Sequence, residues 1–146
     1  MIIFLPVRKD DANVVIYTDA SFRKDDAGIS YVVEGMKAKC RHIPVSSNVR
    51  AEAKAILMAL KDLPKDAKDV TVYNDNQPLV DGINGVADTM SDATPVIHEI
   101  QATLRDIPGV KMEWIPRSEN KCADALAYHA LNYCNLQAEK VLEFWI

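Results

Sequence analysis

The alternation of apolar and polar positions predicts a chain that begins with three strands and continues with alternating helices and strands. A run rich in β-branched residues predicts a strand over residues 14–19, and two further strands are predicted over residues 28–33 and 36–43. Glu34-Gly35 separates the second run from the third as a hairpin turn would, which favours an antiparallel meander.

Helical spacing dominates the remainder of the chain. Apolar residues at positions 53, 56, 57, 60 and 63 share one face of a helix that follows the cap-forming segment Ser46-Ser47-Asn48 and ends at Pro64. Further strands are predicted over residues 69–74 and 110–115, and further helices over residues 75–83, 94–104 and 118–131, with Ser118 as the last cap. The order β-β-β-α-β-α-α-β-α predicts an α/β fold: a five-stranded mixed sheet, three antiparallel strands and then two parallel strands, flanked by helices on both faces.

The length and composition predict a single soluble domain. The 146 residues fit one domain, residues 1–146, with a core at about residues 12–131 and a hydrophobic tail at residues 132–146. No apolar run is long enough to span a membrane, and the opening MIIFLPVRKDD lacks a basic leader and a cleavage site, so we expect a cytoplasmic protein. The tail ends in Phe144-Trp145-Ile146, which we expect to dock on the body of the protein or on a second subunit.

The three cysteines, Cys40, Cys122 and Cys134, do not suggest a structural role. Their number is odd and no pair has the spacing of metal ligands. Free thiols in a reducing compartment are the expected state, and the sequence leaves a disulfide open.

Four acids occupy positions where strands end and helices begin. Asp19 ends the first predicted strand, Glu52 lies in the first turn of the first helix, Asp75 follows the fourth strand, and Asp124 lies one turn into the last helix. Such positions converge on a crevice in α/β sheets, and four carboxylates there would repel one another without a cation. Oxygen ligands suit Mg²⁺ or Mn²⁺. Taken singly, each acid also fits a turn, a helix start or a solvated surface.

Four segments around these acids resemble, in family order, the motifs of type 1 ribonuclease H, in particular its short archaeal and plant-like branch. The resemblance covers most of the chain, from about residue 16 to residue 130. The matching segments are YTDAS at residues 17–21, NVRAE at residues 48–52, VYNDNQ at residues 72–77 and WIPRSENKCADALA at residues 114–127.

The resemblance implies an endoribonuclease with the ribonuclease H-like fold that cuts the RNA strand of RNA/DNA hybrids. Two ions of Mg²⁺ or Mn²⁺ would be bound by Asp19, Glu52, Asp75 and Asp124, and the products would carry a 5′-phosphate and a 3′-hydroxyl. Catalytic and substrate-binding roles follow in the same way. Arg117 would assist catalysis, and Ser21, Asn48, Arg50, Asn76 and Gln77 would contact the substrate. The alternative role of Asn48 is to cap the helix. The alternative for Asn76 and Gln77 is that they are simply exposed to solvent in the first turn of a helix.

The chain departs from many members of the family in two places. The loop before the last helix carries no histidine, and Arg117 occupies that region. A basic protrusion that grips the DNA strand is also absent, because residues 85–109 contain only Arg105 as a strong base. Cations that flank the motifs would have to replace that grip, although each also reads as a solvated surface charge. These cations are Arg23, Lys24, Arg50, Arg117 and Lys121.

Charge and competing functions limit the interpretation. The net charge of −4 is unusual for a protein that binds nucleic acid, although neutralising the four acids would leave equal numbers of acidic and basic side chains. A nuclease of the same fold that acts on double-stranded RNA or another duplex, and a non-catalytic nucleic-acid-binding domain, remain alternatives. We expect a monomer rather than a dimer, and we expect Trp114 to pack in its strand.

Overall fold

A computed structural model describes residues 14–88, 91–136 and 139–143 of the chain. The strands are β1 (Val14–Arg23), β2 (Asp26–Val33), β3 (Lys37–Pro44), β4 (Val70–Asn74), β5 (Val110–Trp114) and β6 (Glu139–Glu143). The helices are α1 (Asn48–Lys61), α2 (Gln77–Ile83), α3 (Thr94–Asp106), the short 3₁₀ helix η1 (Arg117–Glu119) and α4 (Lys121–Tyr133). The predicted order of strands and helices is confirmed.

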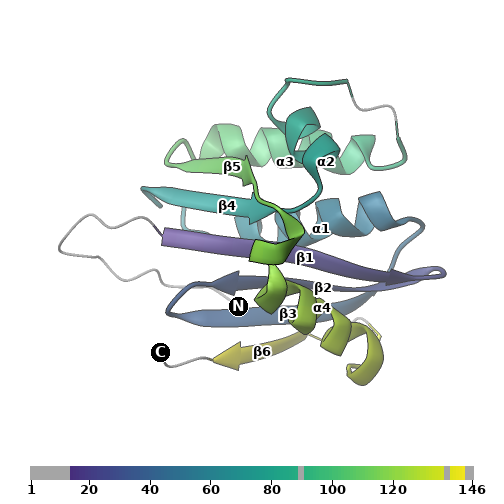
Figure 1. Ribbon diagram of the computed structural model, residues 1–146. Coiled ribbons are helices and arrows are strands. Elements are labelled where there is room, and N and C mark those ends of the chain that lie inside the picture. Colours follow the sequence, from purple (N-terminus) through teal and green to yellow (C-terminus); the bar gives the residue numbers. More distant parts are fainter. Residues whose placement is uncertain (1–13, 89–90, 137–138, 144–146) are drawn as a thin grey trace.

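The strands form one mixed sheet in the order β5-β4-β1-β2-β3-β6 (Figure 1). β1, β2 and β3 pair antiparallel as a meander, while β4 runs parallel to β1 and β5 runs parallel to β4. The predicted five-stranded arrangement is therefore confirmed, and Gly35, with a φ of 75°, makes the β2–β3 turn.

The C-terminal tail adds a sixth strand that the sequence did not predict. β6 pairs antiparallel with β3, from Lys37 opposite Glu143 to Arg41 opposite Glu139. The tail therefore docks on the body of the protein, one of the two expected outcomes, and it covers the edge of β3. The predicted docking residues Phe144, Trp145 and Ile146 lie outside the described residues.

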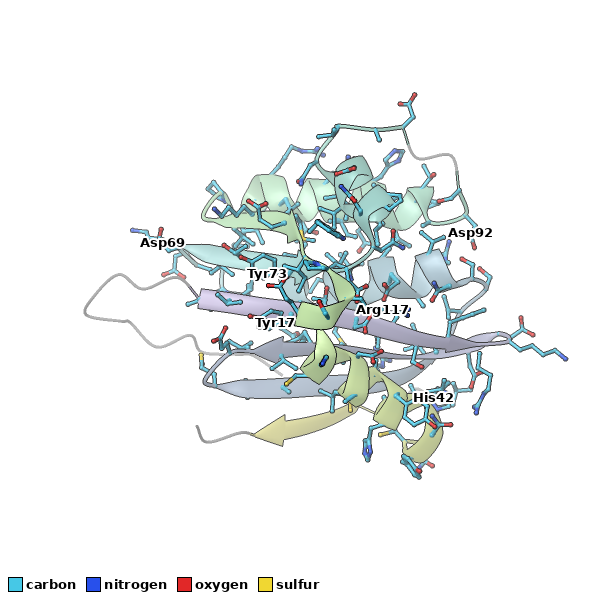
Figure 2. All side chains as sticks on the ribbon, in the orientation of Figure 1. Tyr17, His42, Asp69, Tyr73, Asp92 and Arg117 are labelled. Carbon is cyan, nitrogen blue, oxygen red and sulfur yellow. The ribbon has the colours of Figure 1, made fainter. Side chains whose placement is uncertain are left out.

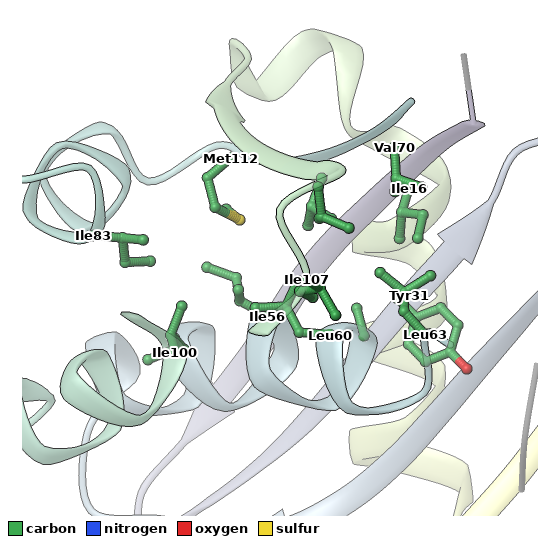
Figure 3. Close-up of a cluster of buried hydrophobic side chains, with 14 of the residues drawn as sticks. Ile16, Tyr31, Ile56, Leu60, Leu63, Val70, Ile83, Ile100, Ile107 and Met112 are labelled. Atoms are coloured by element: carbon green, nitrogen blue, oxygen red, sulfur yellow. The ribbon is translucent and has the colours of Figure 1, made fainter. Parts of the chain in front are cut away.

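The main hydrophobic core lies between the sheet and the layer formed by α1, α2 and α3 (Figure 3). Ile16 and Tyr31 enter this core from the sheet, Ile56 and Leu60 from α1, and Ile100 from α3, each at most 1% exposed. The helical face predicted for α1 is confirmed, because spacing by three and four residues places these apolar side chains against the sheet.

α4 covers the opposite face of the sheet, in front of β2 and β3 in Figure 1. Gly28 of β2 permits this close packing, because a Cβ atom at that position would lie 1.9 Å from the backbone oxygen of Ala127. Beside it, the Ser30 hydroxyl donates to the backbone oxygen of Ala123 at 2.6 Å. Helices therefore cover both faces of the sheet, as predicted. These contacts of α4 hold its start against β1 and β2.

Several predicted boundaries differ from the observed ones. β1 continues four residues beyond Asp19, because it stays paired with β2 as far as Arg23. The cap of α1 is Ser47, which lies within the predicted cap segment and whose hydroxyl accepts from the Arg50 backbone N–H at 3.2 Å, so Asn48 is the first helical residue and its alternative as the cap is excluded. α4 begins at Lys121, and Ser118 lies in η1 instead of capping α4.

Within the described part of the chain, no helix is both long enough and apolar enough to cross a membrane. The three cysteines are free thiols: Cys40 is buried, Cys134 is half-buried and Cys122 is exposed.

Candidate metal centre

The candidate site lies where two parallel strands of the sheet part. β1 and β4 pair from Val14 opposite Val70 to Tyr17 opposite Tyr73, and beyond that point β1 pairs only with β2. The Tyr17 and Tyr73 rings stack at the last pair, with centroids 5.7 Å apart (Figure 2). The opening that follows is a switch point of the sheet, where ligands bind in α/β folds.

Three of the four predicted carboxylates meet in this opening. Asp19 and Asp75 each lie two residues beyond the last pair of β1 and β4. Glu52 enters from α1 just after the first turn of that helix, and not from within the first turn as expected. One carboxylate oxygen from each of the three lies within 4.8 Å of the others. Asp19 is 4% exposed and Glu52 is 5% exposed, while Asp75 is half-buried.

Burial perturbs the charge on Asp19. Loss of solvent, together with the negative charges of Asp75 and Asp124, raises the pKa of Asp19 from 3.8 to about 7. Hydrogen bonds from the Glu52 carboxyl and from the Ala20 backbone N–H act in the opposite direction and lower this pKa. At neutral pH, Asp19 is therefore only partly ionised in the absence of a cation.

Burial also disfavours the ionised form of Glu52. Loss of solvent raises the pKa of Glu52 well above 4.5, and the nearby Asp19 carboxylate acts in the same direction.

A divalent cation would reduce the repulsion among these buried carboxylates. Oε1 of Glu52 is buried and has no hydrogen-bond partner, which is unfavourable for a carboxylate oxygen. Three oxygen donors that repel one another in a buried pocket match the ligand set of Mg²⁺ or Mn²⁺. Asp19, Glu52 and Asp75 therefore fit a hard divalent cation.

Polar side chains that the sequence analysis did not assign hold the opening in place. The Thr18 hydroxyl donates to the Tyr73 backbone oxygen at 2.7 Å, and Nδ2 of Asn74 donates to Oγ1 of Thr18 at 3.1 Å. Nδ2 of Asn120 donates to the Thr18 backbone oxygen at 2.9 Å and to Oδ2 of Asp75 at 3.2 Å. Asn120 thus ties the start of α4 to β1 and to a carboxylate of the cluster.

Asp124, the fourth predicted carboxylate, is not part of the close cluster. It lies in the first turn of α4 and is exposed. Its charge still raises the pKa of Asp19, which places it within electrostatic reach of the other three. The predicted quartet is therefore observed as a buried trio with a more distant, exposed member.

The remaining predicted site residues lie at the ends of elements around the cluster. Arg117 begins η1 and is exposed, and Figure 2 shows it beside the start of α4. Ser21 lies on β1 two residues after Asp19 and is half-buried. Gln77 is exposed at the start of α2, while Oδ1 of Asn76 accepts from the Leu79 backbone N–H at 3.1 Å as the cap of that helix.

Asn48 and Arg50 lie in the first turn of α1, on the same helix as Glu52. Asn48 is exposed, whereas a guanidinium nitrogen of Arg50 donates to the Asp92 backbone oxygen at 2.8 Å. The same Asp92 accepts from the hydroxyls of Ser46 at 2.8 Å and Ser47 at 2.7 Å. These hydrogen bonds, led by the one from Ser47, lower the pKa of Asp92, so an anionic side chain already lies against the start of α1.

The prediction that Trp114 packs in its strand is wrong. Trp114 is 41% exposed on β5, which is an edge strand, and its indole N–H donates to the Asp75 backbone oxygen at 3.1 Å. The indole therefore fixes the backbone that carries a candidate ligand. The residue type alone gave no indication of this contact, because it depends on how β4 and β5 lie side by side.

Known proteins are similar to this chain in both sequence and fold. A family model described as reverse transcriptase-like matches residues 18–130. The protein named “Putative hydrolase EbsB” of Enterococcus faecalis is 30% identical over 125 residues, which cover 80% of this chain and 92% of that protein.

Two solved structures align with most of the chain. The structure of LC11-RNase H1 in complex with RNA/DNA hybrid has a TM-score of 0.73 and 25% identity, covering 82% of this chain and 97% of that one. RNase H1 from the halophilic archaeon Halobacterium salinarum has a TM-score of 0.68 and 26% identity, covering 83% and 98%.

The sheet order, the two helical layers and these alignments define a protein with the ribonuclease H-like fold. The chain belongs to the reverse transcriptase-like family, and its resemblance to type 1 ribonuclease H is confirmed.

Proposed function

We propose that the protein is a metal-dependent endoribonuclease that hydrolyses the RNA strand of RNA/DNA hybrids and leaves 5′-phosphate and 3′-hydroxyl ends. The observation that carries this proposal is the buried trio of Asp19, Glu52 and Asp75 in the opening between β1 and β4. Support comes from the relatives, one named a hydrolase and one solved with a hybrid bound.

Asp19, Glu52 and Asp75 would hold two divalent cations, with Asp124 as an additional ligand from the start of α4. When bound, such cations supply an activated hydroxide and stabilise the charge that develops on the phosphate and the leaving oxygen. The protein itself contributes a rigid frame, because Asn120 and Trp114 hold the side chain and the backbone of Asp75. Binding of the cations would require Glu52 to release its proton.

The substrate contacts in this proposal come from the segments around the trio. Asn48, Asn76 and Gln77 carry amides that can bond to ribose 2′-hydroxyls, the group that distinguishes RNA from DNA. Ser21 and Arg50 would contact the backbone of the hybrid, and Arg117 would hold a phosphate oxygen as a catalytic accessory.

The test is cleavage of end-labelled RNA/DNA hybrid, RNA duplex and DNA duplex, each with Mg²⁺ and with Mn²⁺. We expect cleavage of the RNA strand of the hybrid only, and a loss of at least about a hundredfold in Asp75→Asn, since this change removes a ligand oxygen. Asp66→Asn is the matched control, because Asp66 is an exposed acid outside the cluster. Equal cleavage of all three duplexes, cleavage of none, or an active Asp75→Asn would refute the proposal.

A further inference from the structure

A basic groove lies on the side of α1 away from the carboxylate trio. It has a volume of about 590 Å³ and is bounded by β3, α1 and the start of α3. Apolar side chains of α1 and β3 form part of its lining. Its charged lining consists of Lys39, Arg41, Arg50, Lys54 and Lys61 with the acids Asp62 and Glu99. The cations thus outnumber the acids by three, in a chain whose net charge is −4.

The two acids of the groove are both engaged by lysines. Lys39 Nζ lies 2.9 Å from Oδ2 of Asp62, and Lys61 Nζ lies 2.6 Å from Oε2 of Glu99. The Tyr31 hydroxyl also donates to Asp62, at 2.6 Å. Neither acid is therefore available to neutralise the other cations of the groove.

Arg41 and Lys54 have no ionic partner among the residues whose side chains the structure describes, which leave out those of β6. Nε of Arg41 is buried and has no hydrogen-bond acceptor. Arg41 lies opposite Glu139 of β6, so the cation of the groove that lies farthest from any described or neighbouring acid is Lys54 on α1. A guanidinium suits a phosphate, because its N–H groups match the geometry of two phosphate oxygens.

The cations on α1 form a line that starts at the same end of the helix as Glu52, on the opposite side of the helix. Arg50, Lys54 and Lys61 follow one another along the helix, and Arg50 precedes Glu52 by two residues. At a rise of about 1.5 Å per residue, the line from Arg50 to Lys61 spans roughly 16 Å, the length of about five base-pair steps. A nucleic acid at the trio would therefore meet this line once it passes around the start of α1.

We propose that this groove binds the phosphate backbone of the nucleic acid beyond the point of cleavage, and thereby takes the place of the basic protrusion that the chain lacks. The inference rests on the proposed function, because the polyanion is the same molecule that reaches the trio. Among the described residues, the lining contains no aromatic side chain, so contacts to phosphate and sugar, and not base stacking, provide the binding. Binding is then insensitive to base sequence and sensitive to salt.

The experiment measures binding of a fluorescent RNA/DNA hybrid in EDTA over a range of salt concentrations. We expect the double variant Arg41→Gln with Lys54→Gln to bind more weakly and to lower the slope of log affinity against log salt by about 2, since each lost phosphate contact lowers it by about 1. A short hybrid that covers only the trio should give the same slope for both proteins.

The matched control removes two exposed lysines outside the groove, Lys65 and Lys111, also by change to glutamine. Lys111 lies on β5, at the opposite edge of the described sheet from β3 and β6. The control should keep the wild-type slope, and equal slopes for the double variant and the control would overturn the inference. If the double variant fails to fold, Lys54→Gln against Lys65→Gln carries the same test with an expected drop of about 1.

Two further outcomes separate this inference from the proposed function. If the double variant loses slope while the wild type cleaves no hybrid, the groove stands as a nucleic-acid site and the proposed nuclease fails. If hybrid is cleaved but the slope is unchanged, the groove fails alone. A third outcome is that polyglutamate binds the wild type but not the double variant, while both proteins bind the hybrid equally well. This result would assign the groove to an acidic protein partner and overturn the inference.

Discussion

Replacing Asp19 with asparagine should stabilise the metal-free protein near neutral pH. Burial raises the pKa of Asp19 from 3.8 to about 7. Between about pH 4 and about pH 7, the folded protein keeps a proton that the unfolded chain has released, so stability falls as the pH rises through this window. A shift of about three pKa units, at about 1.4 kcal/mol per unit, corresponds to about 4 kcal/mol at most.

Asparagine has nearly the same shape, can accept the hydrogen bond from the Ala20 backbone N–H and carries no charge. The free energy of unfolding of Asp19→Asn in EDTA should therefore exceed that of the wild type by about 2–4 kcal/mol at about pH 8, and by much less at about pH 4. Such a difference is a large part of the roughly 5–15 kcal/mol that stabilises a typical domain. Urea unfolding followed by circular dichroism measures it directly.

Mg²⁺ should reverse the order of the two proteins. A cation bound by the trio stabilises the wild type by mass action, and Asp19→Asn loses much of this effect together with a ligand. Asp124→Asn is the control, because Asp124 is exposed and its removal should change stability little in EDTA. If Asp19→Asn is no more stable than the wild type at about pH 8 in EDTA, the reasoning from buried charge is refuted.

Two further predictions concern the packing and the acid stability of the fold. Gly28→Ala would place a methyl group 1.9 Å from the Ala127 backbone oxygen, so α4 would have to move. We therefore expect the free energy of unfolding to fall by about 1–3 kcal/mol or more, with lower activity. An unchanged melting temperature would contradict this packing. A hydrogen bond with His42, at 2.6 Å, lowers the pKa of Asp26 in the folded protein. The stability that this carboxylate provides is therefore fully present above the pKa of Asp26 in the unfolded chain. It is lost as the pH falls through the lower pKa of the folded protein. Asp26→Asn should therefore weaken the protein at neutral pH but not in strong acid, and a urea midpoint lowered equally at both pH values would exclude this coupling.

The features of the fold that the sequence predicted are those with local signals. Short apolar segments, the first of them rich in β-branched residues, identified β1 to β3, helical spacing identified the buried face of α1, and Glu34-Gly35 identified a turn. The resemblance then selected Asp19, Glu52 and Asp75 from 21 acids, and the structure brings these three together. Their convergence could be expected because parallel strands and the helices between them end at a common edge.

The features that the sequence did not predict depend on contacts between distant residues. Asn120 fits the position of a helix cap, yet its side chain bonds to Thr18, 102 residues earlier in the chain. Trp114 was expected in the core, although its strand is at the edge of the sheet. β6 exists because β3 offers it an unpaired edge, and no pattern within the tail alone specifies that pairing.

The position of α1 reconciles a negative net charge with a polyanionic substrate. Successive residues of a helix are about 100° apart, so Glu52 and Lys54 project about 200° apart. Glu52 enters the buried trio, while Lys54 lines the basic groove. One helix thus presents an acid of the cation site on one side and the basic side chains of the groove on another. A nucleic acid responds to this local field at close range, because salt screens more distant surface charges. The net charge of the whole chain therefore says little about its affinity for a hybrid, and the salt dependence of the groove variants measures the quantity that matters.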